Sequence, residues 1–151
     1  MKRSSSRSRP AQAVRSPLPV VSAELVEVLV ERLGRRGDGL ALSPDGQRLY
    51  IPAALPGERV HVRLGEARAD GFAAEIVEIL DPSPERVEPP CPHFGRCGGC
   101  SLQHFDPAAY LAWKIGRLTA ALAKADIVGY ELRPAVRSAA GERRRATFSA
   151  E

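Results

Sequence analysis

The chain has 151 residues, of which 44% are hydrophobic and 5% aromatic, and its formal net charge is +4. This length suits one domain or two small ones, and the apolar fraction argues against wholesale disorder. No apolar run approaches the ~20 residues that a membrane-spanning helix needs, so we expect no membrane partner. Residues 1–22 carry five basic residues and no acidic one, without the apolar stretch of a secretory signal, and we interpret them as a disordered basic tail.

Charge is distributed unevenly along the remaining sequence. Residues 23–90 carry eight arginines against thirteen acidic residues, whereas residues 91–151 carry nine basic residues against five acidic ones. The middle of the chain is therefore acidic overall, and its net charge gives no reason to assign nucleic-acid binding to it.

Residues 23–82 have the pattern of a small β domain. The stretch SPDGQ predicts a hairpin turn around Asp45-Gly46, and Pro56-Gly57 fits the centre of a second turn. Between the turns, apolar and polar residues alternate, as in Val60 and Val62 against Arg59 and His61. The first segment, AELVEVLVERL, alternates less strictly and also permits a helix. About five short strands joined by tight turns predict a mainly β, OB-like five-stranded barrel.

Residues 83–105 are predicted to be a proline-rich linker and a cysteine-rich loop, and residues 106–151 a helix followed by the start of a further, truncated β domain. Asp106 is a good helix N-cap and Pro107 suits the first helical position. Apolar residues then recur at helical spacing, and we expect this stripe to be buried core and the helix to stop near Gly129. The stripe consists of Leu111, Ile115, Leu118 and Leu122.

All three cysteines of the chain, Cys91, Cys97 and Cys100, fall in the stretch CPHFGRCGGCSLQH. An odd, clustered set argues against a disulfide framework and favours a reducing, cytoplasmic compartment. The C-x5-C-x2-C spacing permits a zinc site completed by His93 or His104, an iron–sulfur cluster, or thiols without a metal. Both histidines are more often hydrogen-bonding loop residues than ligands.

The cysteine stretch resembles the iron–sulfur motif of the RNA 5-methyluridine methyltransferases, which use S-adenosylmethionine to methylate uracil C5 in ribosomal or transfer RNA. The preceding GDGLALSPDGQRLYIPAALPGERVHVRL and EIVEILDPSPERVEPPC are similar to the TRAM domain of that family, an OB-like barrel. The following YLAWKIGRLTAAL resembles the helix after the cluster, and ERRRATFSA resembles the strand that opens the central RNA-binding domain. The resemblance covers about residues 24–151.

The resemblance implies a [4Fe-4S] cluster with Cys91, Cys97 and Cys100 as three of its ligands. The fourth cysteine of the family lies further along, so we expect it beyond Glu151 and expect a three-cysteine cluster to be labile. No residue matches the family's S-adenosylmethionine site, its nucleophilic cysteine or its proton-removing carboxylate. We therefore assign no catalytic residue and expect an enzyme fragment that is inactive alone. A C-x3-C-x2-C loop, typical of radical enzymes, does not fit the five-residue gap.

RNA is the partner that the resemblance implies, and the arginines supply candidate contacts. The best group is Arg143, Arg144 and Arg145, because three adjacent guanidinium groups favour a nearby anion such as phosphate. In the barrel, Arg35 and Arg36 lie in the first loop and Arg48 on the third strand. Further candidates on the barrel are Tyr50, Arg59, His61 and Arg63. For each barrel candidate the alternative is an ordinary charged surface, in which acids such as Glu58 and Glu66 compensate the arginines.

Two further expectations follow for the cysteine loop. Phe94 and Phe105 flank it and are expected to shield a cluster from water rather than to stack a base. The rival function is a stand-alone RNA-binding TRAM module with a Cys3His zinc site and no enzymatic role.

Overall fold

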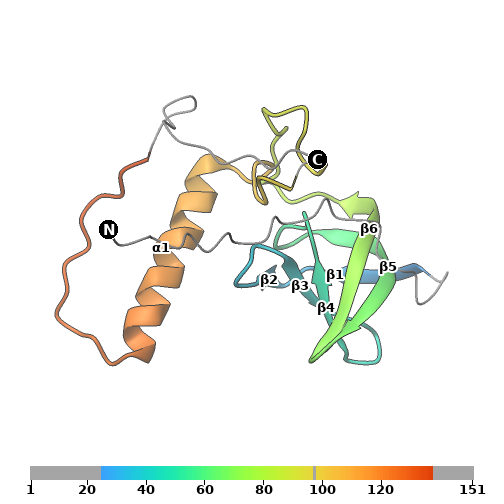
Figure 1. Cartoon of the computed structure of the whole chain (residues 1–151), viewed down its shortest axis with the longest axis horizontal. Helices are drawn as coiled ribbons and strands as arrows, with labels where there is room; N and C mark the ends of the chain where they lie inside the picture. The colour runs from blue at the N-terminus through green and yellow to red at the C-terminus, as the bar shows by residue number, and fades with distance from the viewer. Residues whose placement is uncertain (1–24, 97, 138–151) are drawn as a thin grey trace, which may run out of the picture.

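The computed structural model describes residues 25–96 and 98–137. Within these ranges it contains six strands and one helix, so the predicted mainly β architecture is confirmed (Figure 1). The elements are β1 (Leu25–Leu29), β2 (Arg32–Leu33), β3 (Gly39–Leu42), β4 (Arg48–Ile51), β5 (Arg59–Arg68), β6 (Gly71–Asp81) and α1 (Pro107–Lys124).

The strands form one curled sheet in the order β1-β5-β6-β4-β3-β2. All neighbours are antiparallel except β4 and β6, which run parallel through Leu49–Phe72 and Tyr50–Ala73. The strongest pairing joins the long hairpin strands β5 and β6, whose register shifts at three places. Such irregularities bend a hairpin strongly, and this bend curls the sheet toward the shape of an OB-like barrel.

The two edge strands of the sheet, β1 and β2, follow one another directly in the sequence. β1 pairs with β5 at one end, and β2 pairs with β3 at the other. At the junction the Val30 amide donates to Glu58 O at 2.8 Å and the Glu31 amide donates to Leu40 O at 2.8 Å. One bent strand therefore changes partners here. The sequence predicted this segment as a single strand, which is why it predicted five strands where the structure has six.

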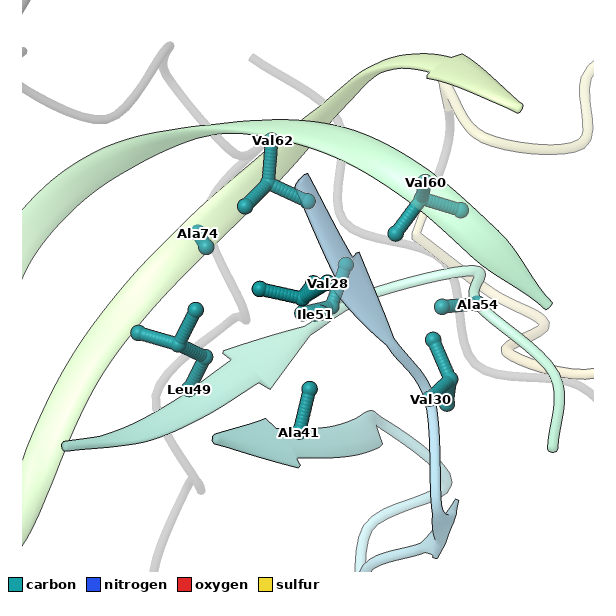
Figure 2. Packing of buried hydrophobic residues seen from close by; sticks show 9 residues of the cluster. All are labelled: Val28, Val30, Ala41, Leu49, Ile51, Ala54, Val60, Val62 and Ala74. Atoms are coloured by element: carbon teal, nitrogen blue, oxygen red, sulfur yellow. The ribbon is translucent and has the colours of Figure 1, made fainter. Parts of the chain in front are cut away.

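The core of the barrel is built mostly from small and β-branched side chains that point inward from strands around the curled sheet (Figure 2). The buried cluster comprises Val28, Val30, Ala41, Leu49, Ile51, Ala54, Val60, Val62 and Ala74. Gly39 lies at a tightly packed point of this core, because a Cβ at this position would meet the Ala54 Cβ at 2.8 Å. Real Cβ contacts do not come so close, so the position requires glycine.

Helix α1 begins as predicted. The Asp106 carboxylate accepts hydrogen bonds from the Ala108 and Ala109 amides at 2.9 Å, and Pro107 occupies the first turn. The helix ends at Lys124 rather than near Gly129, because Asp126 already adopts a left-handed conformation with φ 53°. Within the described part of the chain, no helix combines the length and the apolar character needed to cross a bilayer.

The expectation that the apolar stripe of α1 is buried core is wrong for the described chain. None of the helix residues is fully buried, and Leu118 is 51% exposed. The apolar contacts of the helix with the barrel come from its first two turns, where Ala109, Tyr110 and Trp113 pack partly on a second small core. That core consists of Leu33, Leu55 and Phe105.

Candidate functional site

The cysteine loop connects the barrel to α1. The two segments that flank the loop pair with each other and form its base. The Val87 amide donates to His104 O at 2.9 Å, and the Asp106 amide donates to Glu85 O at 2.8 Å. An isolated antiparallel bridge joins Arg86 and Phe105 beside these bonds. The predicted linker is therefore extended, as its prolines require, and its pairing with the start of the helix closes the loop at its base.

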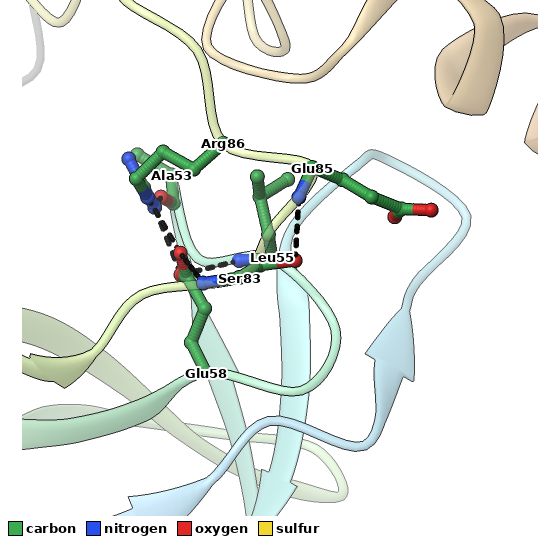
Figure 3. Close-up of polar contacts among 6 residues, drawn as sticks. All are labelled: Ala53, Leu55, Glu58, Ser83, Glu85 and Arg86. Carbon is green, nitrogen blue, oxygen red and sulfur yellow. Dashed lines mark hydrogen bonds and ion pairs between the residues drawn. The ribbon is translucent and has the colours of Figure 1, made fainter.

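A buried ion pair fixes this base to the barrel (Figure 3). Glu58 is fully buried, and its carboxylate accepts hydrogen bonds from Arg86 Nε at 2.5 Å and from Arg86 Nη2 at 2.8 Å. The same carboxylate accepts from the Leu55 amide at 2.8 Å and from the Ser83 amide at 3.2 Å. Arg86 also donates to Ala53 O at 2.7 Å. This arrangement satisfies both carboxylate oxygens and corrects the interpretation of Glu58 as a solvated surface acid.

Burial and the ion pair shift the pKa values of Glu58 and His104. Burial opposes the ionised form of Glu58, but the hydrogen bonds from Arg86 and from the two amides, with the charge of Arg86, outweigh it and lower the pKa of Glu58. For His104, burial and then the charge of Arg86 lower the pKa to about 4. His104 is 1% exposed, and neither ring nitrogen has a hydrogen-bond partner among the described residues. Its imidazole is therefore an interior, neutral group at pH 7.

The described cysteines differ in exposure. Cys91 is half-buried and Cys100 is exposed, and neither forms a disulfide. Cys100 Sγ accepts a hydrogen bond from Gln103 Nε2 at 3.1 Å. Cys97 lies outside the described residues, among which no three His, Cys, Asp or Glu side chains gather as a metal site would require. The metal site of Cys91, Cys97 and Cys100 therefore stays a prediction.

The two aromatic residues beside the loop have different surroundings. Phe94 lies against the His104 ring, with 5.2 Å between ring centroids. Phe105 is 5% exposed and belongs to the second core, where it meets Tyr110 edge-on at 6.5 Å. Phe105 is thus a packing residue beneath the helix rather than a residue available to stack on a base.

The candidate cations on the barrel face are mostly paired with acids. Arg48 contacts Asp70 at 2.5 Å, and the Tyr50 hydroxyl donates to the same carboxylate at 2.7 Å. The Tyr50 bond is the largest cause of a lowered pKa at Asp70, and the Arg48 contact adds to it. Arg68 lies over the Tyr50 ring at 5.1 Å. A shallow pocket of about 470 Å³ adjoins this group, with Arg48, Arg68 and Asp70 in its lining.

Strand β5 carries a second balanced network. Arg59 pairs with Glu27 at 2.8 Å and with Asp81 at 3.3 Å. His61 lies 3.3 Å from Glu78 and 3.9 Å from Glu27. This part of the barrel is an ordinary charged surface, the alternative that the sequence left open.

Arg35 and Arg36 are exposed in the turn between β2 and β3, as a solvent-facing contact requires. Within the described ranges, neither forms an ion pair with a carboxylate. The predicted contacts Arg143, Arg144 and Arg145 lie outside the described residues, as does the predicted basic tail.

Sequence reasoning missed two features of this region. It did not identify the pair of Glu58 with Arg86, and it did not anticipate that Arg117 of α1 would reach the β2–β3 turn. Arg117 NH1 donates to Arg35 O at 2.6 Å across 82 positions of sequence. Neither contact has a local sequence signal, because each joins segments that only the fold brings together.

The curled, mainly β sheet has the form of an OB-like barrel, and residues 23–77 match the TRAM domain. Over 88 residues the chain is 49% identical to an uncharacterized RNA methyltransferase of Caulobacter vibrioides, covering 58% of this chain and 20% of the relative. Over 112 residues it is 41% identical to the 23S rRNA (uracil(1939)-C(5))-methyltransferase RlmD of Acidithiobacillus ferrooxidans, covering 68% of this chain and 25% of the relative.

A third relative, an uncharacterized RNA methyltransferase of Brucella suis, is 39% identical over 131 residues, which is 87% of this chain and 30% of the relative. The chain therefore carries a TRAM domain and is a homologue of proteins named as RNA (uracil-C5) methyltransferases, as the sequence resemblance predicted. It spans between a fifth and a third of the length of these relatives.

Proposed function

We propose that this chain is the RNA-binding, N-terminal part of a cytoplasmic RNA (uracil-C5) methyltransferase that acts on ribosomal RNA. The observation that carries the proposal is the TRAM domain at residues 23–77 in a chain whose relatives include 23S rRNA (uracil-C5) methyltransferases. OB-like barrels bind single-stranded nucleic acid through a strand face and its loops. In this proposal the chain holds RNA, and the methyl transfer itself is assigned to none of residues 1–151.

Three groups of arginines are proposed to contact the RNA. Arg35 and Arg36 are exposed and free of carboxylate partners in the described chain, so they are available to phosphate without first breaking an ion pair. Arg48 lies beside Tyr50 and shares Asp70 with it, so RNA must compete with that carboxylate there. The third group is Arg143, Arg144 and Arg145.

We also propose that Cys91, Cys97 and Cys100 hold a [4Fe-4S] cluster, with a fourth ligand from outside residues 1–151. The donor set fits this group chemically. Cys91 and Cys100 are free thiols, and the Gln103 amide donates to Cys100 Sγ as amides commonly do to cluster-bound thiolates. When bound, the cluster would tie the loop together rather than transfer electrons, and the paired base beneath the loop would keep it near the barrel.

Crosslinking tests the RNA proposal most directly. RNA that contains 4-thiouridine is bound by the 151-residue chain, irradiated and digested, and the crosslinked peptides are identified by mass spectrometry. We expect crosslinks at the β2–β3 turn, at the start of β4 and around residues 143–145. Crosslinks confined to the balanced surface of Arg59 and His61, or an absence of crosslinks, would contradict the proposal.

Anaerobic reconstitution tests the cluster. The chain is supplied with iron and sulfide and then compared with its Cys91→Ser and Cys100→Ser variants. We expect a brown protein with a broad absorption band at about 400 nm, which both substitutions weaken strongly. A colourless chain that binds stoichiometric zinc instead would favour the Cys3His alternative.

A further inference from the structure

Arg117 of α1 is held in place from two sides. Its guanidinium group lies 5.1 Å from the centre of the Trp113 ring, and its NH1 donates to Arg35 O at 2.6 Å. A guanidinium group carries five N–H donors, so one bond to a carbonyl leaves most of them available. The ring and the carbonyl together restrict the side chain, so a ligand that binds it pays little of the usual ordering entropy.

The surroundings of Arg117 are basic, unlike those of the arginines on the barrel that form ion pairs. Helix α1 contains no acidic residue over its 18 positions, and Lys114 lies over the Tyr110 ring at 5.4 Å. Through its contact with Arg35, Arg117 adjoins the exposed Arg35–Arg36 turn that follows β2. The acid nearest to this turn in the sequence is Asp38, which is largely buried and whose carboxylate lies 3.9 Å from Arg68.

Four arginines of the barrel and its linker provide a contrast with Arg117. Arg48, Arg59, Arg68 and Arg86 each face a carboxylate in the structure. Within the same described ranges, no carboxylate pairs with Arg35, Arg36, Lys114 or Arg117. Cations that have no acidic partner favour an external anion, and the RNA backbone supplies a phosphate at every nucleotide.

We propose that Arg35, Arg36, Lys114 and Arg117 form a phosphate-binding ridge that carries the backbone of single-stranded RNA from the barrel onto helix α1. The proposal rests on the RNA-binding function above and extends it to a surface outside the barrel. Arg117 is the central contact, because it is the ordered guanidinium group that joins the helix to the turn. The Trp113 ring packs against the Arg117 guanidinium group. Because Trp113 is the single tryptophan of the chain, its fluorescence is sensitive to this contact.

The test measures binding of a fluorescent uridine-rich single-stranded RNA by the 151-residue chain at several salt concentrations. Each phosphate neutralised on a single strand contributes about −0.7 to the slope of log K against log salt. We expect Arg117→Gln to weaken binding about tenfold at low salt and to flatten the slope by about 0.7. Arg117→Lys should keep the slope but lose affinity, because it retains the charge without the planar fork.

Arg59→Gln is the matched control, because it removes the same charge from a residue already neutralised by Glu27 and Asp81. It should leave the slope unchanged. Lys114→Gln supplies a second ridge variant that does not touch the contact with Arg35, and it should flatten the slope as Arg117→Gln does. Circular dichroism establishes that each variant keeps its fold and helix.

The outcomes separate this proposal from the broader one. If the wild-type chain binds no RNA, the proposed RNA-binding function fails and the ridge fails with it. If the wild type binds RNA and the ridge variants behave like Arg59→Gln, only the ridge is refuted. In that case a shift of Trp113 emission in Arg117→Gln would identify Arg117 as a structural tether between helix and barrel.

Discussion

Removing Arg86 should destabilise the protein more than removing any surface arginine. Arg86→Met keeps much of the side-chain volume but leaves the Glu58 carboxylate, which is fully buried, with only its two amide donors. Breaking a buried ion pair by removing one partner costs ~3–5 kcal/mol, because the remaining charge is buried without compensation. A small domain is stable by only about 5–15 kcal/mol, so this loss is a large fraction of the total.

Urea unfolding followed by circular dichroism at pH 7 measures this loss. Arg59→Met is the control, because Arg59 is about half exposed and its surface pairs are worth ~0–1 kcal/mol. A double variant, Glu58→Gln with Arg86→Met, should lose clearly less than the sum of the two single variants, since no unpaired charge remains. If Arg86→Met unfolds at the same urea concentration as Arg59→Met, the assignment of Glu58 and Arg86 as the clamp of the loop base is wrong.

The pH dependence gives the same pair an independent check. The pKa of Glu58 is lowered in the folded state, so its contribution is fully present above the ordinary carboxyl pKa and is lost as the pH falls below it. The difference in unfolding free energy between wild type and Arg86→Met should therefore shrink on going from pH 7 to acid. A difference that stays constant over this range would show that protonation of Glu58 does not weaken its interaction with Arg86.

Three further predictions concern other parts of the structure. The pKa of His104 is lowered to about 4, so the unfolding free energy of the wild type should fall by ~3 kcal/mol as the pH falls from 6.5 to 4. The unfolding free energy of His104→Leu, measured by urea titration at each pH, should fall by less over the same range. Asp106→Ala removes the N-cap of α1 and should cost about 1 kcal/mol, visible as lower helix content and an earlier thermal midpoint. Gly39→Val should cost ~1–3 kcal/mol because its Cβ would meet Ala54, whereas Gly116→Ala, in open space on the helix, should stabilise by up to ~1 kcal/mol in the same melts.

The local elements could be predicted because their signals are local. The turn at Asp45-Gly46, the turn at Pro56-Gly57 and the capped start of α1 all depend on residues within a few positions of one another. Glycines with positive φ occur at both turns, with φ 81° at Gly46 and 82° at Gly57. The chemistry of such residues fixes the backbone before any tertiary contact forms, so sequence alone suffices.

The functional surfaces could be predicted only in part, because pairing decides which cations are free. Arg48 and Arg59 look like Arg35 in the sequence, yet the fold brings Asp70 to Arg48 and Glu27 to Arg59. Glu58 looks like a surface acid until Arg86, 28 positions away, is folded against it. The apolar stripe of α1 predicted a helix correctly, but periodicity gives no information about what covers a helix, so its burial was predicted wrongly.

Equilibrium RNA binding by the 151-residue chain as a function of salt concentration is the most direct test of the account. Single-stranded uridine-rich RNA should bind at low salt with a negative slope of log K against log salt of at least about 1.4, corresponding to two phosphates contacted by Arg35 and Arg36. No binding at the lowest salt, or affinity that does not change with salt, would contradict the claim that this TRAM barrel holds RNA.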